Sequence, residues 1–95
     1  MPFLTQPPDP RPRQPRLALP LGACDCHFHL FGPAGRYPVD PESPYVSGEA
    51  LPETYFALQD TLGLERGVLV SGGAYGRDYT HLADTLARFP GRLRG

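Results

Sequence analysis

The sequence contains no lysine and only two cysteines, and none of its apolar runs approaches the ~18 residues that a membrane-crossing helix needs. Its nine basic residues are all arginine, and ten acidic residues leave a net charge of −1. This balance lacks the strong basic excess that is typical of nucleic-acid-binding proteins. We therefore expect a small-molecule substrate, with no nucleic acid and no membrane as partner.

The two cysteines, Cys24 and Cys26, are separated by one residue. In an extended strand their Cα atoms would be ~6.6 Å apart, which is at the far edge of disulfide reach. We expect two reduced thiols in a cytoplasmic protein. A metal site built on this Cys-x-Cys pair would need further ligands, and no other cysteine supplies them.

Prolines mark the organisation of the chain. Residues 1–16 hold six of the thirteen prolines, which predicts an extended, polyproline-like arm over residues 1–19 that packs across the end of a larger structure. A strand is predicted over residues 23–30, ended by Gly32 and Pro33. The next ~19 residues are rich in Pro, Gly and Ser, and loops of this length are usually functional or disordered.

The second half of the chain alternates helix and strand. A helix is predicted over residues 52–62, with proline in its first turn, an apolar stripe and Gly63 at its end. The stretch "GVLVSGG" has the pattern of a buried parallel strand. A second helix is predicted over residues 78–89, with Asp78 as N-cap. The apolar stripes consist of Tyr55, Leu58 and Leu62 in the first helix and of Leu82, Leu86 and Phe89 in the second.

This order of elements predicts an α/β fold with parallel strands joined by crossover helices. The closing "RLRG" resembles the start of a third strand. A sheet with so few strands would leave both edges unpaired and much apolar surface exposed. We therefore expect residues 20–95 to be the N-terminal part of a larger fold, incomplete in this chain.

The stretch "CDCHFHL" places His27 and His29 one residue apart near the end of the first strand. Alternation predicts Asp25, His27 and His29 on one face, and Cys24, Cys26 and Phe28 on the other. In a closed barrel the histidines would lie at the C-terminal mouth, where barrel active sites occur. Two imidazoles there could hold one metal ion or polarise one carbonyl oxygen. A bare His-x-His is also frequent by chance, and a structural role stays open.

Four stretches together resemble the N-terminal end of an amidohydrolase-superfamily barrel: "GACDCHFHLFGPAGRYP", "PYV", "LQDTLGLERGVLV" and "AYGRD". More narrowly they resemble the branch of 2-pyrone-4,6-dicarboxylate lactonase, an enzyme of aromatic catabolism. The resemblance covers about residues 20–95. It implies a TIM (β/α)8 barrel in which the His-x-His pair, a later histidine and a late-strand aspartate surround the hydrolysed carbonyl.

The resemblance assigns roles to four residues. It implies that His27 and His29 are catalytic and polarise the lactone carbonyl, and that Tyr45 contacts substrate from the long loop. Gly73 matches a substrate-contacting position that is serine in the lactonase branch. The amides of Gly72 and Gly73 could form an anion-binding nest or a plain tight turn. His81, the remaining histidine, is expected in a solvated or capping role.

The expected activity is that of a hydrolase acting on a lactone, with a small carboxylate such as 2-pyrone-4,6-dicarboxylate as substrate and no cofactor. One alternative is a metal-dependent amidohydrolase or decarboxylase in which His27 and His29 bind a divalent metal such as zinc. Another is an inactive fragment. The general base of the last barrel strand and the arginines that would bind carboxylates are expected outside these residues, in the missing C-terminal part of the barrel.

Overall fold

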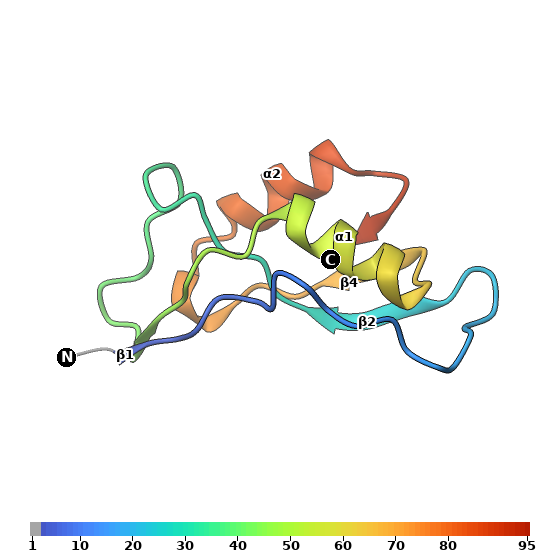
Figure 1. The fold of residues 1–95 in the computed structure, drawn as a ribbon. Helices are drawn as coiled ribbons and strands as arrows, with labels where there is room; N and C mark the ends of the chain where they lie inside the picture. The colour runs from blue at the N-terminus through green and yellow to red at the C-terminus, as the bar shows by residue number, and fades with distance from the viewer. Residues whose placement is uncertain (1–2) are drawn as a thin grey trace.

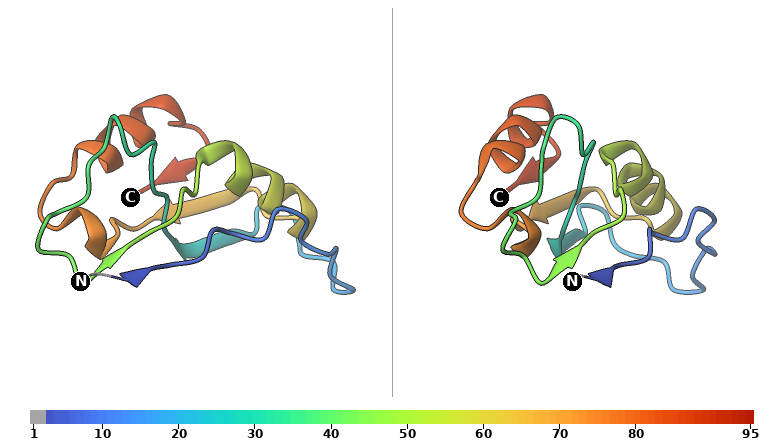
Figure 2. Two further views of the ribbon diagram at one scale, coloured as in Figure 1. Left: turned by 60° about the vertical axis from the view of Figure 1, so that its left-hand side comes forward. Right: turned by 90° about the vertical axis from the view of Figure 1, so that its left-hand side faces the viewer.

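Three parallel strands form the main sheet of the computed structural model, which describes residues 3–95. The strand order is β2 (Cys24–Phe28), β4 (Arg66–Leu69) and β5 (Leu93–Arg94). Helix α1 (Pro52–Leu62) lies between β2 and β4 in the chain, and helix α2 (Thr80–Arg88) lies between β4 and β5. Both helices cover the same side of the sheet (Figures 1 and 2). The parallel pairing of the first strand with "GVLV" and the third strand in "RLRG" are therefore confirmed.

The N-terminal arm forms one short strand that the sequence did not predict. Strand β1 (Phe3–Leu4) pairs in parallel with β3 (Tyr45–Val46) in the long loop after β2. The pairing continues through the Thr5 N–H, which donates to the Val46 carbonyl at 2.9 Å. Residues 5–19 of the arm carry no helix or strand, and its first two residues lie outside the described part of the chain.

Helix α1 has the predicted bounds, whereas α2 is shorter than predicted. Gly63 ends α1 in a left-handed conformation (φ 81°), and its N–H donates to the Gln59 carbonyl at 2.8 Å. Tyr79, and not Asp78, is the N-cap of α2. Asp78 instead accepts the Thr80 N–H in the turn before the helix. Hydrogen bonding to the Thr80 side chain, and then to its backbone, lowers the pKa of the Asp78 carboxyl. The capping prediction was wrong because the turn begins two residues before the helix.

Strand β2 contains an extra residue that changes which side chains share a face. Asp25 pairs with Gly67 and Phe28 pairs with Leu69, so three steps along β2 match two steps along β4. Such a bulge shifts the alternation by one residue. Asp25 and Phe28 consequently lie on the same side of the sheet, which corrects the predicted grouping of Asp25 with the histidines and of Phe28 with the cysteines. The strand also ends at Phe28, two residues before the predicted end.

The hydrophobic core lies between the sheet and the two helices. The Phe28 and Tyr55 rings stack with centroids 3.7 Å apart and planes within 5° of each other. Gly67 makes this approach possible, because a Cβ there would lie 2.7 Å from both Phe28 Cε1 and the Tyr55 hydroxyl. The buried cluster comprises Phe28, Leu30, Tyr55, Leu69 and Leu93, with Phe56, Leu82, Leu86 and Phe89 packed against it.

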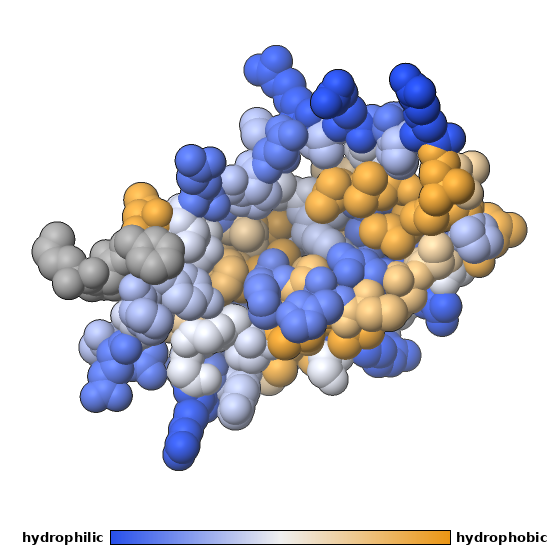
Figure 3. Space-filling view, turned by 90° about the horizontal axis from the view of Figure 1, so that it is seen from below, coloured by the Kyte–Doolittle hydropathy of each residue, from blue (hydrophilic) through white to orange (hydrophobic). Residues whose placement is uncertain are grey.

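The side of the sheet opposite α1 and α2 carries no helix (Figure 2). Seen from below, it presents a broad region of hydrophobic side chains among polar ones (Figure 3). In a complete barrel this side of the strands would face the interior. Within residues 3–95, helices long and apolar enough to cross a membrane are absent.

Candidate functional site

His27 and His29 lie together at the carboxyl end of β2. Their ring centroids are 5.1 Å apart, and the planes cross at 83° in an edge contact. Both side chains are exposed. His27 is in the strand and His29 is the first residue beyond it, so the pair sits where β2 passes into its loop. The two rings are close enough to act on one small group.

A backbone hydrogen bond orients the His29 ring. Its Nδ1 lies 2.8 Å from the Val70 carbonyl oxygen, immediately after β4. Because a carbonyl oxygen only accepts, the proton of this bond is on Nδ1. Within the described residues Nε2 has no hydrogen-bond partner, so it is the nitrogen available to a ligand. The neighbouring strand thus fixes both the tautomer and the direction of this histidine.

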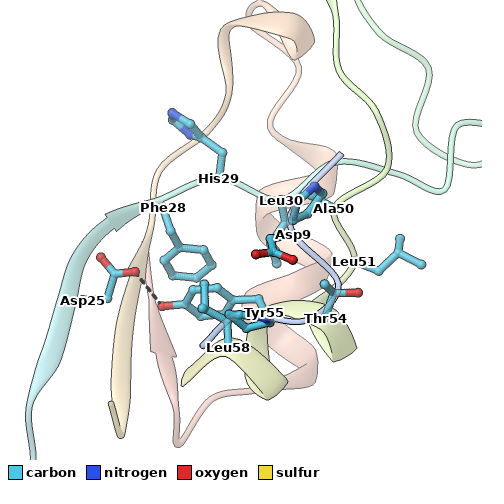
Figure 4. Close-up of a pocket in the computed structure, with 12 residues that line it drawn as sticks. Asp9, Asp25, Phe28, His29, Leu30, Ala50, Leu51, Thr54, Tyr55 and Leu58 are labelled. Atoms are coloured by element: carbon cyan, nitrogen blue, oxygen red, sulfur yellow. Dashed lines mark hydrogen bonds between the residues drawn. The ribbon is translucent and has the colours of Figure 1, made fainter. Parts of the chain in front are cut away.

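Asp25 is separated from the histidines by the bulge in β2. Its Oδ2 accepts the Tyr55 hydroxyl at 3.0 Å, and its Oδ1 accepts the His27 backbone N–H at 3.1 Å. Figure 4 shows Asp25 and Phe28 turned toward Tyr55, whereas the His29 ring points away from them. Burial, and then the bond to Asp25, raises the pKa of the Tyr55 hydroxyl. Asp25 therefore belongs to the packing side of the sheet.

The Asp25–Tyr55 bond is one end of a longer polar network beneath α1. Gln59, which is fully buried, donates from Nε2 to the Tyr55 hydroxyl at 3.0 Å and accepts from Arg92 Nε at 2.8 Å. Arg92 also pairs with Asp60 at 3.1 Å. The network ties β2 and α1 to the turn before β5. No local sequence pattern indicates that Gln59 is buried, because its burial depends on an arginine 33 residues away.

Tyr45 and Gly73 are brought together by the structure. The Tyr45 hydroxyl accepts the Ala74 N–H at 3.1 Å, and a Cβ on Gly73 would lie 3.5 Å from that oxygen. The Tyr45 ring meets Phe31 edge-on at 6.5 Å, and Phe31 lies 6.0 Å from the His29 ring. The loops after β2 and β4 thus meet close to the histidine pair.

Gly72 and Gly73, for which the sequence left an anion-binding nest and a plain tight turn open, lie in a turn. Gly72 is extended, with φ −70° and ψ 145°, and it precedes the 3-10 helix η1 (Gly73–Tyr75). The Tyr75 N–H donates back to the Gly72 carbonyl at 3.1 Å. This geometry favours the turn interpretation.

His81 is buried, which corrects its expected solvated or capping role. Only 6% of its surface is exposed. Its ring stacks on Tyr75 at 4.9 Å and meets Tyr37 edge-on at the same distance. Burial lowers the pKa of the His81 imidazole, against the opposing effects of a hydrogen bond to the Gly32 backbone and of Asp84. No local sequence pattern indicates this burial, because Tyr37, which covers the edge of the ring, is distant from His81 in the chain.

A cavity of about 230 Å³ lies beside His29, between the N-terminal arm and α1 (Figure 4). Its walls are mainly apolar, and Asp25 and His29 are among its polar members. Pro8, Asp9 and Pro12 of the arm close one side. The arm therefore packs along α1 next to the end of β2.

Metal ligands are only partly supplied by the described residues. Within residues 3–95, groups of three or more His, Cys, Asp and Glu side chains that could hold a metal ion are absent. His27 and His29 provide two imidazoles side by side, and the Nδ1–H of His29 on a backbone carbonyl is the second contact that metal-binding histidines commonly make. Cys24 and Cys26 are free thiols, as predicted. The pair fits part of a metal site.

Comparisons with known proteins agree with this geometry. A sequence model described as Amidohydrolase matches residues 24–95. A "2-pyrone-4,6-dicarbaxylate hydrolase" of Comamonas testosteroni is 37% identical over 84 residues, covering 88% of this chain and 28% of that protein. A "4-sulfomuconolactone hydrolase" of Rhizobium radiobacter is 40% identical over 78 residues, covering 82% of this chain and 26% of that protein.

A solved structure is also similar. The apo crystal structure of ATU3138 from Agrobacterium tumefaciens superposes with a TM-score of 0.77 at 30% identity, covering 90% of this chain and 30% of that one. The chain thus spans less than a third of the length of the relatives it matches. With three quarters of its residues matched by the family model, the chain belongs to the amidohydrolase family.

Proposed function

We propose that this chain carries the first catalytic histidines of a lactone-hydrolysing amidohydrolase. The observation that carries the proposal is the pair of rings at the carboxyl end of β2, one of them oriented by the strand beside it. The names of the relatives from Comamonas and Rhizobium support a lactone as the substrate class. The substrate is then a small cyclic ester bearing acidic groups.

The fold supports this placement. The order β2–α1–β4–α2–β5, parallel and with both helices on one side, is that of the first units of a (β/α)8 barrel. In our proposal residues 20–95 form these units and residues 1–19 form the arm across their side. The other barrel strands, with the base that activates water, lie outside this chain.

The histidines act on the carbonyl oxygen of the lactone. Water adds to the carbonyl carbon, negative charge develops on the oxygen, and the ring opens when the ester C–O bond breaks. The Nδ1–H of His29 remains hydrogen-bonded to the Val70 carbonyl. A proton on Nε2 as well allows the ring to donate a hydrogen bond to the developing oxyanion. His27, in edge contact with this ring, is placed to make the second such contact.

A metal-dependent reaction is the second candidate, and the tautomer of His29 favours it. A ring with its only proton on Nδ1 presents an Nε2 lone pair, which binds cations and does not donate. His27 and His29 would hold a divalent ion such as zinc together with ligands from elsewhere. Such an ion would act as a Lewis acid toward the lactone carbonyl.

Hydrolysis by the whole protein, expressed from its entire reading frame, tests the proposal. We expect loss of the pyrone absorbance of 2-pyrone-4,6-dicarboxylate in its presence. Assays before and after dialysis against a chelator, with zinc added back, separate the two candidates. Retained activity supports hydrogen-bond donation by the histidines, and activity that is lost and restored by zinc supports the metal. Absence of hydrolysis of this and other acidic lactones under all conditions contradicts both.

A further inference from the structure

Gly32, three residues after His29, is held by a side chain from beyond β4. Its N–H donates to the Tyr75 hydroxyl at 2.8 Å in a buried hydrogen bond. The His81 ring of α2 stacks on Tyr75 and lines the same cavity as Gly32.

The holding side chain is itself fixed. Tyr75 is 4% exposed and His81 is 6% exposed, and their rings stack with planes 24° apart. The Tyr37 ring meets His81 edge-on at 4.9 Å. These ring contacts leave the Tyr75 hydroxyl little freedom to move.

The backbone changes direction at Gly32, in a conformation that these contacts hold in place. Its φ of 95° lies in the left-handed region, which other residues rarely adopt. The preceding Phe31 exchanges two backbone hydrogen bonds of 2.9 Å with Ala50, so the segment is held on its other side too. The Phe31 ring lies 5.8 Å from Tyr75 and 6.0 Å from His29. Movement of Gly32 would therefore shift Phe31 and the histidine beside it.

We infer that Tyr75 is a positioning residue for His29, which acts through the backbone of Gly32. It fixes the loop that leaves β2 so that the His29 Nδ1–H stays on the Val70 carbonyl and Nε2 keeps its direction. The kinetic test of this inference rests on the proposed lactone hydrolysis, whereas its test by ring-nitrogen NMR does not.

The experiment compares single substitutions in the whole protein. Tyr75→Phe removes the hydroxyl bonded to Gly32 and keeps the ring. Tyr37→Phe is the matched control, because it removes a hydroxyl bonded to Asp84 in the same cluster.

We expect Tyr75→Phe to lower kcat about 10- to 100-fold with KM changed less than about twofold, since small displacements of reacting groups act mainly on the chemical step. Tyr37→Phe keeps the kcat of the unaltered protein. In ring-nitrogen NMR spectra, the His29 Nδ1–H signal should broaden or exchange faster in Tyr75→Phe and not in Tyr37→Phe.

Unchanged kcat together with an unchanged His29 signal in Tyr75→Phe overturns the inference, as does an equal effect of Tyr37→Phe. If the unaltered protein hydrolyses no lactone but the His29 signal changes in Tyr75→Phe alone, the positioning role stands and the proposed function fails. Folding of each variant is checked by its thermal unfolding midpoint, which a specific positioning effect leaves close to that of the unaltered protein.

Discussion

The two sides of β2 differ in how completely their polar groups are engaged. On the side of α1, Asp25 is bonded to Tyr55, and the network continues through the buried Gln59 to Arg92. On the other side, His27 and His29 are exposed, and among the described residues only one of their four ring nitrogens is hydrogen-bonded. Polar groups that are fully paired stabilise a fold, and groups left available at a strand end can bind a ligand. The bulge between Asp25 and Phe28 separates these two roles within five residues.

Removal of a histidine from the open side of β2, the side opposite α1, should give the largest effect. It should lower kcat and leave the stability of the fold unchanged. We expect His27→Ala in the whole protein to lower kcat about 10²-fold, as loss of an oxyanion-stabilising group does. The free energy of unfolding should change by less than about 0.5 kcal/mol, because the side chain is exposed. Cys26→Ser, at the exposed neighbouring residue, is the control and should leave kcat unchanged. A loss of stability that parallels the loss of activity would contradict the distinction between the two sides.

A methyl group added on the packed side should destabilise the fold. Gly67→Ala places a Cβ 2.7 Å from Phe28 and from the Tyr55 hydroxyl, and overpacking of this kind costs about 1 to 3 kcal/mol. Gly35→Ala is the matched control, because a Cβ there has nothing within 4 Å. Chemical denaturation measures the free energy of unfolding of both variants. Equal stability of the two variants would show that the Phe28–Tyr55 stack is not tightly packed.

Removal of one hydroxyl from the network should have a smaller effect. Tyr55→Phe keeps the stacked ring but leaves Asp25 Oδ2 and the Gln59 amide without their shared partner. We expect a loss of about 1 to 2 kcal/mol in the free energy of unfolding. Tyr79→Phe, at a tyrosine that is 57% exposed, should cost nothing measurable by the same denaturation experiment. If Tyr55→Phe left the free energy of unfolding unchanged, solvent would have replaced the hydroxyl in the network.

Acidification should give the smallest effect, and it should depend on His81. Burial lowers the pKa of this imidazole in the folded state, so the unfolded chain binds the proton more readily. Stability therefore falls as the pH drops below about 6.5, the ordinary histidine pKa, toward the lower folded value. The groups around the ring are Tyr37, Tyr75 and Asp84, with Arg36, Glu53 and Arg88 along the same cavity.

Thermal unfolding midpoints between pH 7.5 and 5.5 measure this effect. The decline should be shallower in His81→Gln, which cannot take up the proton. An equal decline in both proteins would assign the acid sensitivity to other groups.

The sequence was sufficient to predict the two helices and the three strands of the main sheet. It was not sufficient to predict on which side of the sheet each side chain of β2 lies. Pro52 and Gly63 mark the ends of α1 by their own backbone preferences, so its bounds were predictable. The extra residue in β2 exists only relative to its partner β4, and alternation within one strand cannot reveal it. Gln59 is buried with an arginine 33 residues away, and His81 packs against the distant Tyr37 as well as the nearby Tyr75. No local pattern encodes the distant contacts. The histidine pair itself was visible because both side chains lie within three residues of the chain.

The most direct test of the central claim, that the open side of β2 binds the lactone, is ring-nitrogen NMR of the whole protein during addition of 2-pyrone-4,6-dicarboxylate or its hydrolysis product. Signals are assigned through the His27→Ala, His29→Ala and His81→Gln variants. We predict that the His27 and His29 signals shift together with saturation, while the buried His81 signal stays in place. Saturable binding that leaves both His27 and His29 unchanged would contradict the account.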